Sequence, residues 1–275
     1  MKVKQIKIDF NVTPEIKRFV FVYAIMTKGS CYLIDSGVAG SEEIIEKTLV
    51  ENGFSPADVK GIFLTHAHPD HIGSANYFRN HYGAKIYASE GERAWIEDID
   101  LQFKERPIPN FYNLAGHSTI VDCAVKDKDT ICLEDDLTVE VIGTAGHSAD
   151  QVSYRINDMI FIGDAIPVKG DIPIFIDLEK TKNTIRILQE LEDIRLYYPA
   201  WDQTYSYELM QTKLAEAKEL VDKLESAVRK NDNNMDILEL VNKVSDNMQM
   251  PMLKSNPLFT RTVEALHKLD SYKSE

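Results

Sequence analysis

Hydrophobic and polar residues follow two periodicities along the first 205 positions. Short apolar or alternating runs, rich in β-branched and aromatic residues and bounded by turn residues, predict β-strands. Longer stretches with apolar residues three and four positions apart predict amphipathic helices. The predicted strands cover residues 2–8, 18–26, 31–34, 62–64, 84–88, 130–133, 137–142, 152–156, 159–164 and 194–198. The predicted helices cover residues 42–51, 72–79, 90–95 and 178–193.

Strands and helices alternate in this part of the chain, but hairpins interrupt the alternation. Lys28-Gly29 and Asn157-Asp158 each separate two adjacent apolar runs, which is typical of a hairpin turn. The pattern therefore favours an α/β layered fold with mixed sheets over a purely parallel sheet. Residues 100–120 contain two prolines and no clear periodicity, so we expect a long loop beside the functional site.

The pattern changes after residue 205. Apolar residues recur at four- and three-residue spacings from Met210 to Val228, which predicts one helical face. Two more helices are predicted over 235–247 and 257–270, and no strand pattern follows. We therefore expect a main domain over 1–205 and a helical C-terminal appendage over 206–275, which would cover a substrate pocket or form a homodimer interface.

Composition and charge narrow the class of protein. Hydrophobic residues make up 44% of the 275 residues and charged residues 27%, as in an ordinary globular protein with a sizeable core. No run approaches the roughly 18 apolar residues of a membrane helix, and the N-terminus has no signal-peptide core. Three widely spaced cysteines suggest no disulfide framework, so we expect a cytoplasmic protein. The net charge of -13 gives no general basis for binding nucleic acid or anionic membrane, which leaves a small-molecule substrate as the expected partner.

The strongest chemical signal is the stretch Thr65-His66-Ala67-His68-Pro69-Asp70-His71, which follows a predicted strand. Three imidazoles and one carboxylate fall within six residues, and these groups suit zinc, iron and manganese. If the backbone stays extended, His66 and His68 point to the same side of the chain, because strand side chains alternate. Asp70 and His71 then face a neighbouring position, so one loop can supply ligands to two adjacent metals.

Three further candidate residues also follow strands, where site residues commonly gather. His147 lies in a loop after one predicted strand, Asp164 ends another, and Asp35 ends a third. Two close cations require a bridging ligand, and Asp164 is our candidate because a carboxylate has two oxygens. Such metals would lower the pKa of a shared water and supply hydroxide near neutral pH, which would allow hydrolysis without a side-chain nucleophile.

Four motifs occur in a defined order: Leu33–Gly37, Thr65–Gly73, Thr144–Ser148 and Ile162–Asp164. In this order the chain resembles the metallo-β-lactamase fold superfamily, especially its glyoxalase II-like branch of metal-dependent hydrolases. The resemblance extends over about 20–205, and it implies a four-layer αββα sandwich of two mixed β-sheets with the metals at one edge. Residues 1–205 would then form the catalytic domain.

The same resemblance implies a role for each candidate ligand. One metal ion would be held by three histidines: His66, His68 and His147. Asp70 and His71 would hold a second ion, and Asp164 would bridge the two. Asp35 would support the ligands from behind, and Asp70 would also accept a proton beside the metal-bound hydroxide. The implied cofactors are one or two divalent metal ions, with zinc expected first and iron or manganese as alternatives.

The chain departs from the family pattern after its last predicted strand. The family has a histidine there, following Pro-Gly, whereas this chain has Trp201 in the sequence Pro-Ala-Trp-Asp. Because indole is not a metal ligand, the second site loses a donor unless Asp202 or, less directly, His117 replaces it. Otherwise the second metal would be weakly bound, absent or completed by water. A site richer in oxygen ligands would favour manganese or iron.

These observations predict a metal-dependent hydrolase that acts on a small ester, thioester or lactone. Candidate residues of the substrate pocket are Trp201, Tyr154, Tyr205 and His117. The alternative is a mononuclear iron oxidoreductase of the persulfide dioxygenase type, using His66, His147 and Asp164. A nuclease is disfavoured by the acidic charge, and Trp201 alone suggests a degenerate ligand-binding protein.

Overall fold

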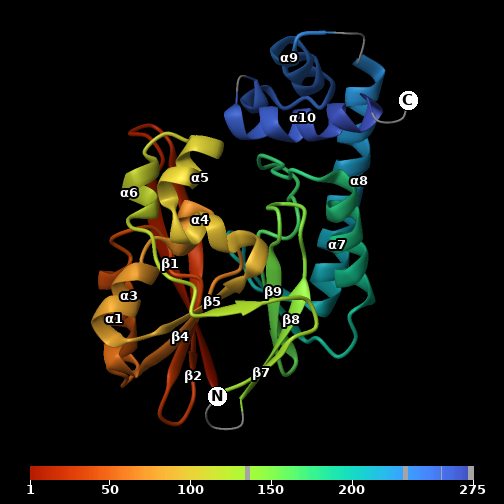
Figure 1. Cartoon of the computed structure of the whole chain (residues 1–275). Helices are drawn as coiled ribbons and strands as arrows, with labels where there is room; N and C mark the ends of the chain where they lie inside the picture. Colours follow the sequence, from red (N-terminus) through yellow and green to blue (C-terminus); the bar gives the residue numbers. More distant parts are fainter. Residues whose placement is uncertain (134–136, 232–234, 255, 272–275) are drawn as a thin grey trace. The chain divides into compact units, whose positions relative to one another are not determined.

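The structure is a computed structural model, and it describes residues 1–133, 137–231, 235–254 and 256–271. The chain forms two compact units (Figure 1). Unit 1 consists of Met1–Gly143, Asp150–Gly163 and Leu196–Thr204. Unit 2 consists of Thr144–Ala149, Asp164–Arg195 and Tyr205–Glu275. Each unit is therefore assembled from three separate segments of the chain.

The first sheet of unit 1 is mixed. Its strands lie in chain order: β1 (Lys2–Asn11), β2 (Lys17–Met26), β3 (Cys31–Ile34), β4 (Val59–Phe63), β5 (Lys85–Ser89) and β6 (Cys123–Val125). The pairs from β1 to β3 are antiparallel and the pairs from β3 to β6 are parallel. Ile6 pairs with Val22 and Ile8 with Val20, so the alternation of β1 places these four buried side chains on one face.

The second sheet is also mixed. Within unit 1 its order is β11 (Leu196–Pro199), β10 (Met159–Gly163), β9 (Val152–Ile156), β8 (Thr138–Gly143) and β7 (Thr130–Cys132). Only the β10–β11 pair among these is parallel. The predicted hairpin between β9 and β10 turns at Asn157, whose φ of 54° is a left-handed value that asparagine tolerates.

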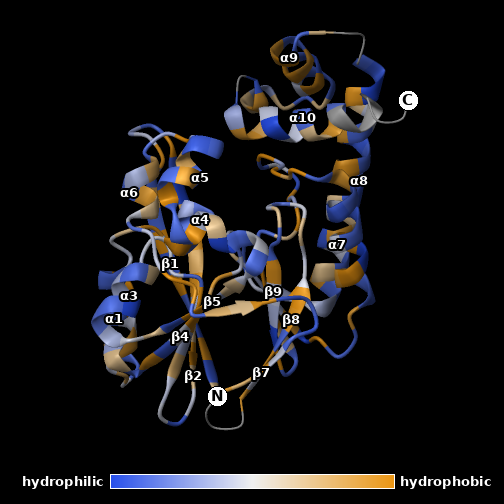
Figure 2. Cartoon of the chain, viewed as in Figure 1, coloured by the Kyte–Doolittle hydropathy of each residue, from blue (hydrophilic) through white to orange (hydrophobic). Residues whose placement is uncertain are grey.

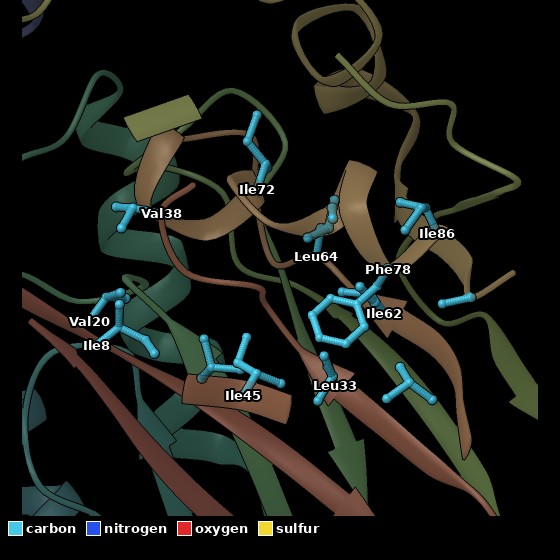
Figure 3. Close-up of a cluster of buried hydrophobic side chains, with 14 of the residues drawn as sticks. Ile8, Val20, Leu33, Val38, Ile45, Ile62, Leu64, Ile72, Phe78 and Ile86 are labelled. Carbon is cyan, nitrogen blue, oxygen red and sulfur yellow. The ribbon is translucent and has the colours of Figure 1, made fainter. Parts of the chain in front are cut away.

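Helices of unit 1 cover one face of the first sheet (Figure 1). They are η1 (Pro56–Asp58), α1 (Glu42–Glu51), α2 (Pro69–Ile72), α3 (Ala75–Tyr82), η2 (Glu90–Glu92), α4 (Arg93–Glu97), α5 (Ile99–Glu105) and α6 (Phe111–Ala115). Figure 3 shows the buried cluster that joins them to the sheet, including Ile45 of α1, Phe78 of α3 and Leu33 of β3. This packing fixes the loop after β4, because Leu64 and Ile72 at its two ends belong to the same cluster.

The opposite face of the first sheet packs on the second sheet. Aromatic residues fill this layer: Tyr23 lies 5.3 Å from Phe161, and Phe63 lies 5.2 Å from Tyr154, between ring centroids. In Figure 2 many strand segments are orange, as expected where strands are covered by other elements. One helical layer and two sheets of the expected αββα sandwich therefore lie in unit 1.

Unit 2 is mainly helical. It contains α7 (Leu178–Glu190), the short strand β12 (Tyr205–Ser206), α8 (Tyr207–Asn231), α9 (Ile237–Asn247), η4 (Pro251–Leu253) and α10 (Pro257–Ser271). Helix α8 contacts α7, α9 and α10, and its predicted face from Met210 to Val228 is buried. The expected α/β architecture of two mixed sheets with a helical C-terminal region is confirmed. Within the described residues, no helix combines the length and apolar character needed to cross a membrane.

The prediction of a long loop over 100–120 is wrong. Helices α5 and α6 occupy most of this segment, and the two prolines lie between them. The side chain of Asp98 caps α5 by accepting a hydrogen bond from the Leu101 N–H at 2.9 Å. The helices are short, so they give too few turns for a recognisable apolar period. The predicted helix over 72–79 likewise divides into α2 and α3.

Candidate metal centre

The loop after β4 carries the histidine cluster into a buried position. His66 and His71 are fully buried and His68 is 5% exposed. His68 is extended, with ψ of 148°, and Pro69 opens α2 directly after it, since proline suits the first helical position. Asp70 and His71 therefore lie in the first turn of α2, and the Asp70 side chain remains 33% exposed.

Asp35 holds this loop from the end of β3. Its backbone has a left-handed φ of 58°, and its side chain is 2% exposed. Asp35 Oδ1 accepts a hydrogen bond from the Thr65 N–H at 2.8 Å, and Oδ2 lies 2.8 Å from His71 Nδ1. The imidazole donates its Nδ1–H to the carboxylate, which leaves Nε2 as the nitrogen able to bind a metal.

Thr65 extends the same network to His66. The Thr65 hydroxyl lies 3.0 Å from Asp35 Oδ2 and 3.0 Å from His66 Nδ1. A hydroxyl that donates to the carboxylate can accept the Nδ1–H of His66, which makes Nε2 the nitrogen of that ring with a lone pair for a ligand. His66 Nε2 lies 2.9 Å from His68 Nδ1. The sequence motifs begin at Thr65 but indicated no role for it, although it is the residue that links Asp35 to His66.

His147 and Asp164 are adjacent within unit 2. His147 Nδ1 lies 2.9 Å from the Ile174 carbonyl oxygen and donates its proton there, so Nε2 is again the nitrogen able to bind a metal. His147 Nε2 lies 3.4 Å from Asp164 Oδ2. The Gly146 carbonyl accepts from the Ile176 N–H at 2.7 Å, so two hydrogen bonds fix the His147 loop on residues 174–176.

The structure brings five of the predicted ligands together. Possible ligand atoms of His66, His68 and His147 lie within 4.8 Å of one another. A second group with the same spacing consists of His66, His71 and Asp164. Four imidazoles and one carboxylate are a donor set that suits zinc or another divalent transition metal.

Neither group includes Asp70 or Asp202 among the residues that the structure describes. Asp70 Oδ2 lies 3.8 Å from His71 Nε2. Asp202 Oδ1 accepts a hydrogen bond from the Gln203 N–H at 2.7 Å, and the neighbouring Trp201 is half-buried against the cluster of Figure 3. His117 is exposed after α6.

The two tyrosines predicted for the substrate pocket lie in the protein interior. Tyr154 is fully buried between the sheets, and its hydroxyl donates to the Leu64 carbonyl oxygen at 2.8 Å. Burial raises the pKa of Tyr154 well above its ordinary value. Tyr205 is also fully buried. Both side chains therefore have no exposed surface for a substrate, and Tyr154 instead fixes the backbone just before the histidine loop.

Comparisons with curated proteins identify relatives named as hydrolases. The chain is 28% identical over 152 residues to a probable metallo-hydrolase of Bacillus subtilis, YqgX, and the match covers 52% of this chain and 64% of that protein. It is 27% identical over 147 residues to a probable polyketide biosynthesis zinc-dependent hydrolase of the same organism, PksB, covering 51% and 56%. It is 25% identical over 178 residues to a hydroxyacylglutathione hydrolase of Bradyrhizobium, covering 62% and 56%. The chain thus spans less than two thirds of the length of these relatives.

The fold has counterparts among solved structures. A metallo-beta-lactamase family protein of Thermus thermophilus, TTHA1429, superposes with a TM-score of 0.76 and 18% identity, covering 98% of this chain and 94% of that one. The family model described as the metallo-beta-lactamase superfamily matches residues 16–200, which is about two thirds of the chain. The histidine loop, most strands of both sheets and the His147 loop lie within the matched region. This protein belongs to the metallo-beta-lactamase superfamily.

Proposed function

We propose that this protein is a metal-dependent hydrolase of a small ester, thioester or lactone. The observation that carries the proposal is the close grouping of buried imidazoles and a partly buried carboxylate, whose possible ligand atoms lie within 4.8 Å of one another in each group. Buried ionisable groups rarely gather in this way unless they are paired or coordinate a metal. Relatives named as metallo-hydrolases support the same reaction class.

The donor set fits a divalent metal ion. His71 and His147 each have Nδ1 hydrogen-bonded to an oxygen acceptor, and His66 Nδ1 is bonded to Thr65. Metal-binding histidines usually have such a partner on the second ring nitrogen, because it fixes the tautomer and the ring orientation. When bound, a divalent cation lowers the pKa of a coordinated water toward neutrality and polarises a carbonyl oxygen.

In this proposal each residue of the centre has a distinct role. His66, His68 and His147 would hold one metal ion, while His71 and Asp164 would hold a second, and Asp164 remains our candidate for a ligand shared by both. Asp35 would fix the orientation of the His71 ring and, through Thr65, of the His66 ring. Asp70, whose carboxylate is one-third exposed, would accept a proton from the attacking water. Asp202, which belongs to neither group of ligand atoms among the described residues, remains a predicted replacement for the missing donor of the second site.

The substrate class rests on the names of relatives. A hydroxyacylglutathione hydrolase acts, by its name, on an acyl group carried by glutathione, and the chain matches it over 178 residues. This supports an acyl thioester as the first substrate to test. Trp201 and His117 as pocket residues, the helical segment 206–275 as a pocket cover or dimer interface, and a cytoplasmic location remain predictions.

The test is turnover of an ester, thioester and lactone panel by protein loaded with zinc, manganese or iron(II). His66→Ala should lower turnover by at least about 100-fold, because loss of a direct ligand should exceed the roughly 10–100-fold cost of losing an outer partner. His81→Ala, an exposed histidine on α3, is the matched control and should leave turnover unchanged. No turnover with any metal would refute the proposal. Elemental analysis that finds one iron per chain, together with oxygen uptake, would favour the oxidoreductase instead.

A further inference from the structure

Backbone groups around the first two histidines are held by neighbouring parts of unit 1. The Leu64 N–H donates to the Tyr87 carbonyl at 2.8 Å, and the Thr65 carbonyl accepts from the Val152 N–H at 3.0 Å. The carbonyl of His68, at the start of α2, accepts from the His71 N–H at 2.9 Å. These three contacts are backbone hydrogen bonds made by neighbouring strands or within the helix itself.

Ala67, between His66 and His68, is held differently. Its N–H donates to Glu92 Oε2 at 3.1 Å, and its carbonyl accepts from Gln102 Nε2 at 2.6 Å. Both contacts are made by side chains rather than by a strand or helix. Glu92 lies at the end of η2, and Gln102 lies in α5, one of the two helices that the sequence pattern did not predict.

Both side chains are deeply buried, although neither side chain is apolar. Glu92 is 2% exposed and Gln102 is fully buried. A glutamate is almost never buried without hydrogen-bonding partners, since desolvation of the carboxylate is costly. The amide oxygen of Gln102 makes no hydrogen bond within the described residues. The hydrogen-bonding capacity of the Gln102 side chain is therefore only partly satisfied, through its NH₂ group. The two residues have in common a hydrogen bond to the backbone of Ala67.

Glu92 also bonds to the backbone three residues after His147. Its other oxygen, Oε1, accepts from the Asp150 N–H at 2.9 Å. The Asp150 carbonyl accepts from Ser89 Oγ at 2.6 Å, and Asp150 Oδ2 accepts from the Gly91 N–H at 2.9 Å. Asp150 is three residues beyond His147 in the sequence. One carboxylate therefore fixes the backbone at Ala67, between two proposed ligands, and at Asp150, three residues after a third.

We infer that Glu92 and Gln102 are positioning residues that set the geometry of the metal centre. The Glu92–Gln102 clamp, meaning these two side chains and their bonds to Ala67 and Asp150, fixes the two peptide groups between His66 and His68. A rotation of either peptide group that adjoins Ala67 would change the separation of the two ligand nitrogens, because one group ends at the His66 Cα and the other at the His68 Cα. The clamp thereby pre-organises the ligands before a metal binds. This inference rests on the proposed metal site.

Two nearly isosteric variants test it. Glu92→Gln leaves one acceptor oxygen for two N–H donors, so either Ala67 or Asp150 loses its partner. Gln102→Met removes the donor to the Ala67 carbonyl and keeps a side chain of similar length. Each variant should weaken zinc binding by about 10–100-fold, the usual effect of losing a partner outside the ligand shell. The measurement is chelator competition with the full-length protein.

A spectroscopic readout separates positioning from stability. The visible absorption of bound cobalt(II) reports coordination geometry, so both variants should shift its bands. Leu49→Ala is the control, because it removes a fully buried side chain of α1 and destabilises unit 1 without removing a hydrogen bond to the histidine loop. Its zinc affinity should stay within about twofold of wild type, a difference smaller than the loss of one outer partner produces, and its cobalt spectrum should not change.

Two results would overturn this inference and leave the proposed metal centre standing. The first is that the clamp variants bind zinc as tightly as wild type and keep its cobalt spectrum. The second is that Leu49→Ala loses as much zinc affinity as the clamp variants do. A wild-type protein that binds no zinc, cobalt, manganese or iron would overturn the proposed metal centre and this inference together. Metal binding without turnover would overturn only the hydrolase proposal.

Discussion

Replacing Asp35 with asparagine should destabilise unit 1 even when no metal is bound. The carboxylate accepts hydrogen bonds from the Thr65 backbone and hydroxyl and from the His71 ring, at 2.8–3.1 Å. Asparagine tolerates the left-handed φ of 58° at this position, so the substitution adds no backbone strain. It replaces one acceptor oxygen with an NH₂ group, which then faces a buried donor.

The size of the effect follows from the burial of the site. Hydrogen bonds to a charged group contribute about 1.5–3 kcal/mol each, and a buried donor without an acceptor costs about 1–3 kcal/mol. Because the asparagine side chain would keep one oxygen, we expect a net loss of about 3 kcal/mol in the free energy of unfolding. That is a large part of the roughly 5–15 kcal/mol that stabilises a typical domain. At about 2 °C per kcal/mol for a chain of this size, Tm should fall by about 6 °C.

The assay is urea unfolding of chelator-treated protein, followed by tryptophan fluorescence. Both tryptophans, Trp95 and Trp201, lie in unit 1, so their emission reports the unit that contains Asp35. Asp9→Asn is the matched control, since Asp9 is 71% exposed and pairs only with Lys7 at 2.7 Å among the contacts described. Its free energy of unfolding should change by less than about 0.5 kcal/mol. A loss below that value for Asp35→Asn would show that the buried network does not stabilise the fold.

Two further predictions concern other parts of unit 1. The exposed Cys132 should react with a disulfide reagent at pH 8 in the native protein, whereas Cys31 should react only after unfolding, because burial raises the pKa of its thiol to about 12. Mass mapping of the modified residues checks this, and rapid labelling of native Cys31 would contradict it. Gly73→Ala should cost about 3 kcal/mol or more, since the added Cβ would collide with backbone atoms of Val38, Ala39 and Leu114. An unchanged urea midpoint would show that the backbone there can move apart.

Much of the fold could be predicted from the chain because the local signals were strong. The alternation in β1, the turn residues between β9 and β10, and the long apolar face of α8 each correspond to an element of the structure. Strand β6 and helices α5 and α6 were missed because they span three to seven residues, too few for a period to be recognised. Their formation depends on tertiary partners, such as the pairing of β6 with β5.

In the candidate site, the ligands could be predicted from the sequence and the supporting residues could not. The ligands on the histidine loop are close in sequence, so their residue types and spacing were enough to indicate a metal. The supporting residues could not be found by that route. Glu92 and Gln102 look like ordinary surface residues of two short helices, and Thr65 looks like a strand-end residue, since the sequence does not show which side chains are buried.

The sequence by itself determined the ligand chemistry, the order of the motifs and the mixed α/β class, because these depend on residue types and short-range periodicity. Only the tertiary structure decided which ligands share a group and which do not: His66, His71 and Asp164 come together, while Asp202 bonds to its own neighbour. The tertiary structure also decided that Tyr154 is a core residue and that Ala67 is held by two buried side chains. The physical reason is that burial and hydrogen-bond partners arise from segments distant in sequence, whose approach no local pattern records.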